Sequence, residues 1–179
     1  ILDCLEEQGL ADETLVIFTS DHGEWLGEHL RYGKGMPGPD CVSRVPFIMR
    51  GPTVSPGTCC DQIVEAVDVV PTLLECCGIQ VAPHLQGDSL ATALDGGAVG
   101  GDGAALMEHS GAKTLRSEGF RYLVRADGSE SLWDLDQDPG EYLDVAGAAK
   151  YVEVLAEHRH MLLRRLVAME RPKERVWSY

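Results

Sequence analysis

The residues best suited to chemistry follow a short apolar run near the start of the chain. Residues 15–18 are uninterrupted aliphatic and aromatic residues, which is typical of a strand buried on both faces of a mostly parallel sheet. Asp21 and His22 come just after this run, and ligands of open α/β sheets bind at the carboxyl ends of strands. A carboxylate beside an imidazole suits a divalent cation. Gly23 would let the chain turn so that both side chains serve one ion.

The same tripeptide is also compatible with an ordinary turn, in which the aspartate caps the next segment and the histidine is exposed. The residues that follow favour a site. Glu24, Glu28, His29 and Lys34 all lie within thirteen residues of Asp21, in a glycine-rich stretch that cannot form a core. His29 could protonate a leaving group, although exposed imidazoles are common. Lys34 could equally be a solvated loop lysine.

A longer series of motifs resembles the sulfatase family of the alkaline phosphatase superfamily. The motifs run in the family's order through nearly the whole chain, at residues 19–29, 33–35, 44–48, 50–52, 67–74, 78–79, 87–90 and 132–141. The resemblance is closest to the branch that holds phosphonate monoester hydrolases and choline-sulfatase-like enzymes. A single Asp-His-Gly would be a weak signal, whereas an ordered series of motifs is a specific one.

The resemblance implies roles for individual residues. Asp21 and His22 match two ligands of a divalent metal ion, with calcium favoured over manganese or zinc. Lys34 matches a lysine that contacts the oxygens of the transferring sulfuryl or phosphoryl group, where its charge would stabilise the transition state. The family's formylglycine nucleophile and a second acidic pair of ligands precede the region seen here. Residues 41–44 (Cys-Val-Ser-Arg) lack the proline of the nucleophile motif.

The expected function is therefore that of a C-terminal fragment of a metal-dependent sulfuric ester hydrolase, which would be inactive alone. Its substrate would be a small anionic sulfate or phosphate ester. Two alternatives stay open: a phosphonate monoester or phosphodiester hydrolase of the same superfamily, and a non-catalytic sulfatase-like interaction domain.

The composition of the chain limits the classes of partner that it could bind. The net charge of −14 and the pI near 4.7 argue against nucleic acid and anionic membranes as partners. Neither a membrane-spanning run nor a signal peptide is recognisable. The six cysteines include two adjacent pairs and do not form a disulfide pattern, so a cytoplasmic location is expected.

The pattern of elements predicts an α/β protein in two parts. Residues 1–100 would contribute to a mostly parallel alkaline-phosphatase-like sheet with helices, including a helix over residues 69–77 with Asp68 as its N-cap. Residues 101–179 would form a small antiparallel meander with strands near 104–108, 113–116, 120–125 and 131–135, followed by a long helix over 148–169. The tail, residues 170–179, could order against another subunit and so support a homo-oligomer.

Overall fold

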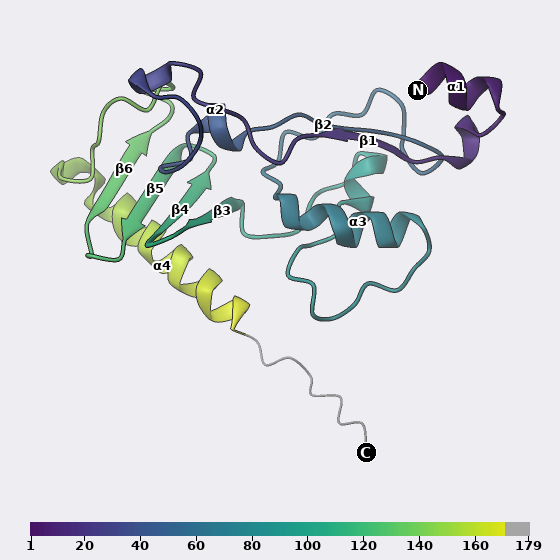
Figure 1. Cartoon of the computed structure of the whole chain (residues 1–179). Helices are drawn as coiled ribbons and strands as arrows, with labels where there is room; N and C mark the ends of the chain where they lie inside the picture. Colours follow the sequence, from purple (N-terminus) through teal and green to yellow (C-terminus); the bar gives the residue numbers. More distant parts are fainter. Residues whose placement is uncertain (171–179) are drawn as a thin grey trace. The chain divides into compact units, whose positions relative to one another are not determined.

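The computed structural model describes residues 1–170 and divides the chain into two units (Figure 1). Unit 1 consists of residues 1–81 and 87–102. Unit 2 consists of residues 82–86 together with the chain from Gly103 onward. The predicted role in oligomerisation concerns the tail at residues 170–179, of which 171–179 lie outside the described residues.

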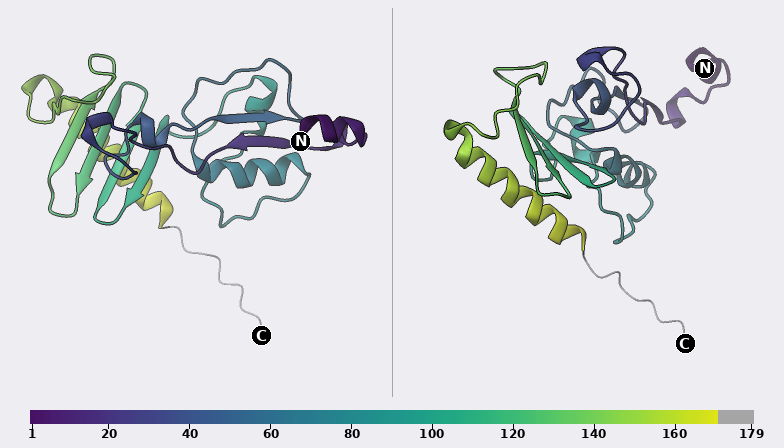
Figure 2. Two further views of the ribbon diagram at one scale, coloured as in Figure 1. Left: turned by 45° about the horizontal axis from the view of Figure 1, so that its top comes forward. Right: turned by 60° about the vertical axis from the view of Figure 1, so that its left-hand side comes forward.

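Unit 1 contains one pair of strands and several short helices. Its α-helices are α1 (Leu2–Glu7), α2 (Asp40–Ser43) and α3 (Val69–Cys76), and its strands are β1 (Val16–Thr19) and β2 (Phe47–Arg50). Short 3₁₀ turns occupy Ala11–Glu13, Glu28–Leu30, Ala66–Asp68 and Ala91–Asp95. Apart from these elements, unit 1 is built from loops, as both views in Figure 2 show.

The first apolar run forms β1, but its surroundings differ from the prediction. In the described chain β1 pairs only with β2, in antiparallel register, so that Phe18 lies opposite Ile48. Phe18 is 62% exposed and Ile48 is 61% exposed. The prediction of burial on both faces is therefore wrong for the described chain. An apolar run is enough to predict a strand, but it does not reveal which elements cover that strand.

Asp68 precedes α3, but its side chain makes no capping hydrogen bond to that helix. Its two carboxylate oxygens accept hydrogen bonds from the main-chain N–H groups of Glu65 (2.8 Å) and Asp88 (2.9 Å). Asp68 is only 6% exposed, and this burial raises the pKa of its carboxyl. The buried Thr72 hydroxyl accepts from the N–H of Leu90 at 2.9 Å. The start of α3 thus holds the Gly-Asp-Ser-Leu motif of residues 87–90 by hydrogen bonds, a role that the sequence did not suggest.

Unit 2 is a four-stranded antiparallel sheet covered on one face by a long helix, as the right panel of Figure 2 shows. The strands follow one another in the order β3 (Ala104–His109), β4 (Ala112–Ser117), β5 (Phe120–Arg125) and β6 (Glu130–Asp134). The helix α4 (Val152–Met169) follows a 3₁₀ turn at Ala149–Tyr151. The core between sheet and helix consists of Ala104, Leu115, Tyr122, Leu132, Tyr151, Leu155 and Leu162.

Buried polar side chains in unit 2 have hydrogen-bond or ion-pair partners. His158 of α4 is buried, with Nδ1 2.8 Å from the Val154 carbonyl and Nε2 2.9 Å from the Ser117 hydroxyl. Arg121 on β5 is fully buried and donates to Glu141, which is 4% exposed. A buried charge of this kind persists only where a partner is held against it.

The α/β class, the antiparallel meander and the long terminal helix are confirmed. No helix of residues 1–170 is long and apolar enough to cross a bilayer. All six cysteines are free thiols.

Candidate active site

Asp21 and His22 leave β1 at its C-terminal end. The main-chain N–H of His22 donates a 2.9 Å hydrogen bond to Asp21 Oδ1. This bond is the main cause that lowers the pKa of the Asp21 carboxyl. The Ser20 hydroxyl donates to the His22 carbonyl at 2.9 Å and so fixes the turn. Asp21 Oδ2 lies 3.6 Å from His22 Nε2, which brings the two predicted ligand atoms to the same side of the turn.

The hydrogen bonds of His22 determine its tautomer. Nδ1 is 2.7 Å from the Gly23 carbonyl, which can only accept, so Nδ1 carries the proton and donates it. Nε2 is then left with a free lone pair, which accepts from the Lys34 ammonium at 2.7 Å. A histidine anchored through one nitrogen to a carbonyl, with the other nitrogen unprotonated, is the arrangement that metal-ligating histidines use.

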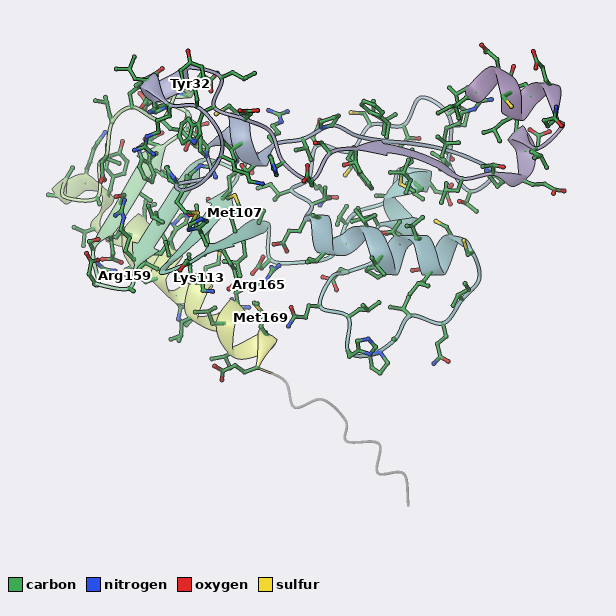
Figure 3. The ribbon with its side chains drawn as sticks, viewed as in Figure 1. Tyr32, Met107, Lys113, Arg159, Arg165 and Met169 are labelled. Carbon is green, nitrogen blue, oxygen red and sulfur yellow. The ribbon has the colours of Figure 1, made fainter. Side chains whose placement is uncertain are left out.

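A closed loop brings Lys34 back to His22, although the two residues are twelve positions apart. The N–H of Trp25 donates to the carbonyl of Gly33 at 2.9 Å, which ties the two ends of the loop together. Trp25 is only 2% exposed and anchors the loop by its buried ring. The Arg31 guanidinium lies 5.2 Å above this ring. By contrast Tyr32, labelled in Figure 3, is 81% exposed. Backbone closure and one buried ring therefore place the lysine.

Position 23 requires glycine because the structure leaves no space for a side chain there. Its φ is not in the left-handed region, so freedom to turn is not what the position demands. A Cβ at Gly23 would lie 2.1 Å from the carbonyl oxygen of Cys41. The N–H of Gly23 donates to the Val42 carbonyl at 2.7 Å, so the segment at α2 packs directly against the site turn.

The residues present fit a divalent cation in part. Ligand atoms lie about 2.0–2.6 Å from such ions, so atoms 3.6 Å apart can share one. A carboxylate oxygen and an imidazole nitrogen are suitable donors for calcium, manganese or zinc. Among residues 1–170, however, no group of three or more His, Cys, Asp or Glu side chains could hold an ion. Asp21 and His22 therefore provide only part of a coordination shell.

Known proteins of one family are similar to this chain. Residues 1–79 match the family model described as Sulfatase. Arylsulfatase K of Xenopus laevis is 33% identical over an alignment of 164 residues, and the match covers 82% of this chain and 30% of that protein. The chain belongs to the sulfatase family.

Solved structures extend the likeness to the fold. A protein solved in complex with its substrate D-glucosamine-2-N,6-O-disulfate superposes with a TM-score of 0.85 at 27% identity, covering 97% of this chain and 38% of the other. The phosphonate monoester hydrolase of Agrobacterium radiobacter superposes with a TM-score of 0.84 at 30% identity, covering 94% and 38%. This sulfatase-family chain thus spans little more than a third of the length of either structure.

His29 belongs to the same loop but occupies a different setting. Its ring lies edge-on to Trp25, with centroids 5.2 Å apart, and its φ of 52° is in the left-handed region. Neither observation tests its predicted role as a proton donor, which stays a prediction.

The sequence did not identify Ser20 and Trp25 as residues that build this sulfatase-family site. A signal was available for Trp25, because a large aromatic residue inside a polar, glycine-rich loop is usually an anchor. Ser20 carried no such signal, since a serine beside an aspartate is common in any turn.

Proposed function

We propose that this chain supplies part of the active centre of a metal-dependent sulfuric ester hydrolase. The observation that carries the proposal is the meeting of Asp21 Oδ2, His22 Nε2 and Lys34 Nζ at the end of β1. A metal ion held by two of these atoms, together with the lysine cation, would bind an anionic ester. The chain's net charge of −14 would otherwise repel such a substrate.

Each residue has a distinct task in this proposal. Asp21 and His22 hold the divalent ion, which would supply Lewis-acid stabilisation of ester oxygens. Lys34 donates hydrogen bonds to the oxygens of the transferring group and offsets the negative charge that develops there. Binding of the ion by His22 Nε2 would displace the Lys34 ammonium from that lone pair, and the closed loop of residues 25–33 would keep the lysine beside the site, where it can turn to the ester oxygens.

The nucleophile and the remaining metal ligands are proposed to come from polypeptide outside these 179 residues. Two facts support this. The described residues lack a complete ligand cluster, and the chain corresponds to 30% of the arylsulfatase K length. We therefore expect the chain by itself to show no turnover of an aryl sulfate.

Metal binding is the first test, with Mn²⁺ as the probe because its unpaired electrons broaden nearby NMR signals. Titration into the ¹⁵N-labelled chain should selectively broaden the amide resonances of Asp21 and His22. Asp21→Asn should weaken this effect, while the control Asp12→Asn, at an exposed position outside the loop, should leave it unchanged. Uniform broadening, or broadening centred elsewhere, would remove the basis for the metal site.

Activity in the intact polypeptide is the second test. With 4-nitrophenyl sulfate as substrate, Lys34→Ala should lower kcat/KM by about 10²–10³-fold, the loss usual for a transition-state donor. Lys150→Ala, at an exposed lysine of unit 2, is the matched control. Lys34-dependent turnover by the 179-residue chain alone would contradict the proposed division of the site.

A phosphonate monoester hydrolase is the second candidate, favoured by the 30% identity and TM-score of 0.84 to the Agrobacterium radiobacter enzyme. Rates on paired phenyl sulfate and phenyl phosphonate esters separate the two chemistries. If the intact polypeptide binds Mn²⁺ yet turns over neither ester, a non-catalytic interaction domain becomes the better interpretation.

A further inference from the structure

The side of α4 that faces away from the sheet carries an apolar stripe. Four apolar residues and one histidine recur at steps of four, four, three and four residues: Val152, Ala156, His160, Leu163 and Val167. The three large apolar residues of the stripe are exposed by 61% (Val152), 59% (Leu163) and 62% (Val167). Such spacing forms a continuous seam along a helix and is typical of helices that pair. Within the described part of unit 2, α4 packs on the sheet through its opposite side, with Leu155 and Leu162, and so leaves this stripe uncovered.

Charged residues flank one edge of the stripe in an ordered way. Glu153 and Glu157 lie beside its N-terminal half, and Arg164 lies beside its C-terminal half. All three are exposed, and within residues 1–170 their side chains form no hydrogen bond or ion pair. The other edge is different, because Arg159, labelled in Figure 3, is engaged by Glu130. The free edge therefore presents an acidic half and a basic half.

We propose that α4 pairs with α4 of a second copy of this chain, in antiparallel orientation, through this stripe. A two-fold axis between residues 159 and 160 would bring Val152 opposite Val167 of the second copy, and Ala156 opposite its Leu163. The small Ala156 then faces the larger Leu163, and two valines face each other, which suits close helix packing. The contact is isologous, since the same surface serves both copies.

Charge complementarity selects the orientation. In the antiparallel arrangement Arg164 lies level with residue 155 of the second copy, between that copy's Glu153 and Glu157. By symmetry the same cluster forms twice. A parallel arrangement would instead set this edge against the opposite edge of the second helix, so Arg164 would not meet Glu153 and Glu157. The antiparallel helix dipoles add a small favourable term.

The pairing should be reversible. One helix seam is smaller than the roughly 800 Å² per partner of a standard stable interface, so monomers and dimers should exchange with concentration. The inference does not depend on the proposed catalytic function, because it uses only residues of α4.

Sedimentation velocity over a concentration series of the 179-residue chain tests the pairing. We expect the weight-average mass to rise from monomer to dimer. Leu163→Glu should abolish the rise by placing a charge in the seam. Leu143→Glu, at a residue that is 65% exposed elsewhere in unit 2, should leave it unchanged. Circular dichroism of each variant confirms that it is folded.

Charge reversal tests the orientation. Arg164→Glu should weaken dimerisation about tenfold, because glutamates would then meet glutamates. Glu153→Arg with Glu157→Arg should weaken it similarly, and the triple variant should restore it. A chain that ends at Glu170 should still dimerise, which separates α4 from the tail.

Four results would overturn the proposal. They are a chain that stays monomeric at all concentrations, a dimer indifferent to Leu163→Glu, a dimer lost on removing residues 171–179, and charge reversals without effect. The last of these would indicate parallel pairing or another surface.

Discussion

The site loop of unit 1 and the sheet–helix assembly of unit 2 are stabilised in different ways. The loop that carries Lys34 relies on main-chain hydrogen bonds and on Trp25, while its charged groups are exposed. In unit 2, side chains such as Leu115 and Leu132 are completely buried, and even the charge of Arg121 is enclosed with a partner. The comparison indicates that the region suited to chemistry has little core of its own, whereas unit 2 is built to hold its shape.

Removal of the buried carboxylate in unit 2 should have the largest effect. Glu141→Ala leaves the guanidinium of Arg121 without this carboxylate, so we expect a loss of about 3–5 kcal/mol in the free energy of unfolding. Urea denaturation followed by circular dichroism measures it. The exposed pair Lys113–Glu108 offers the contrast, since Glu108→Ala should cost about 1 kcal/mol or less. Equal losses would show that burial does not distinguish the two pairs.

Truncation of a core side chain should come next. Leu132→Ala opens a cavity between sheet and helix, and a loss of about 2–5 kcal/mol is expected in the same measurement. Leu143→Ala, at a 65% exposed leucine, should change stability by about 0.5 kcal/mol or less. A small effect at Leu132 would mean that unit 2 is more loosely packed than its burial indicates.

A change in unit 1 should act more on the site than on stability. Gly23→Ala forces a Cβ against the Cys41 carbonyl, so we expect a loss of about 1–3 kcal/mol together with weaker Mn²⁺ broadening at His22. Gly147→Ala is the control, since a Cβ there meets nothing within 4 Å and φ is not positive. Unchanged Mn²⁺ binding in Gly23→Ala would show that the close approach does not position the site.

The smallest effect should be a pH dependence in unit 2. Glu130 accepts hydrogen bonds from Arg159 and Tyr122, and chiefly the Arg159 contact lowers the pKa of its carboxyl below the ordinary 4.5. A lowered pKa contributes stability above the unfolded value, and this contribution is lost as the pH falls through the folded value.

The stability gap between wild type and Glu130→Gln should therefore be present at pH 6, amount to about 1 kcal/mol or less, and shrink towards pH 3. Denaturation at several pH values measures the gap. Glu118→Gln, at an exposed glutamate, should show no such trend. A gap that widens on acidification would contradict the assigned pairing.

The sequence predicted the elements more readily than their surroundings. The meander and α4 follow from local alternation and helical periodicity, which depend on neighbouring residues alone. The exposure of Phe18 depends on which distant segments cover β1. The hydrogen bond from Asp88 to Asp68 likewise depends on which distant segments meet, and no local sequence pattern encodes such contacts. Asp21, His22 and Lys34 could be named from types and spacing, but the Lys34–His22 contact depends on closure of the loop at Trp25 and Gly33.

The division of the chain has a practical consequence for dissecting the protein. The polypeptide passes from one unit to the other three times, because residues 82–86 belong to unit 2 while residues 87–102 return to unit 1. Gln86 even donates to the carbonyl of Met169 at the end of α4. A single protease cut after residue 102 should therefore not liberate two intact halves, since the N-terminal piece would retain residues 82–86 of unit 2. Domain boundaries for separate expression should be drawn with a grafted copy of residues 82–86 on unit 2.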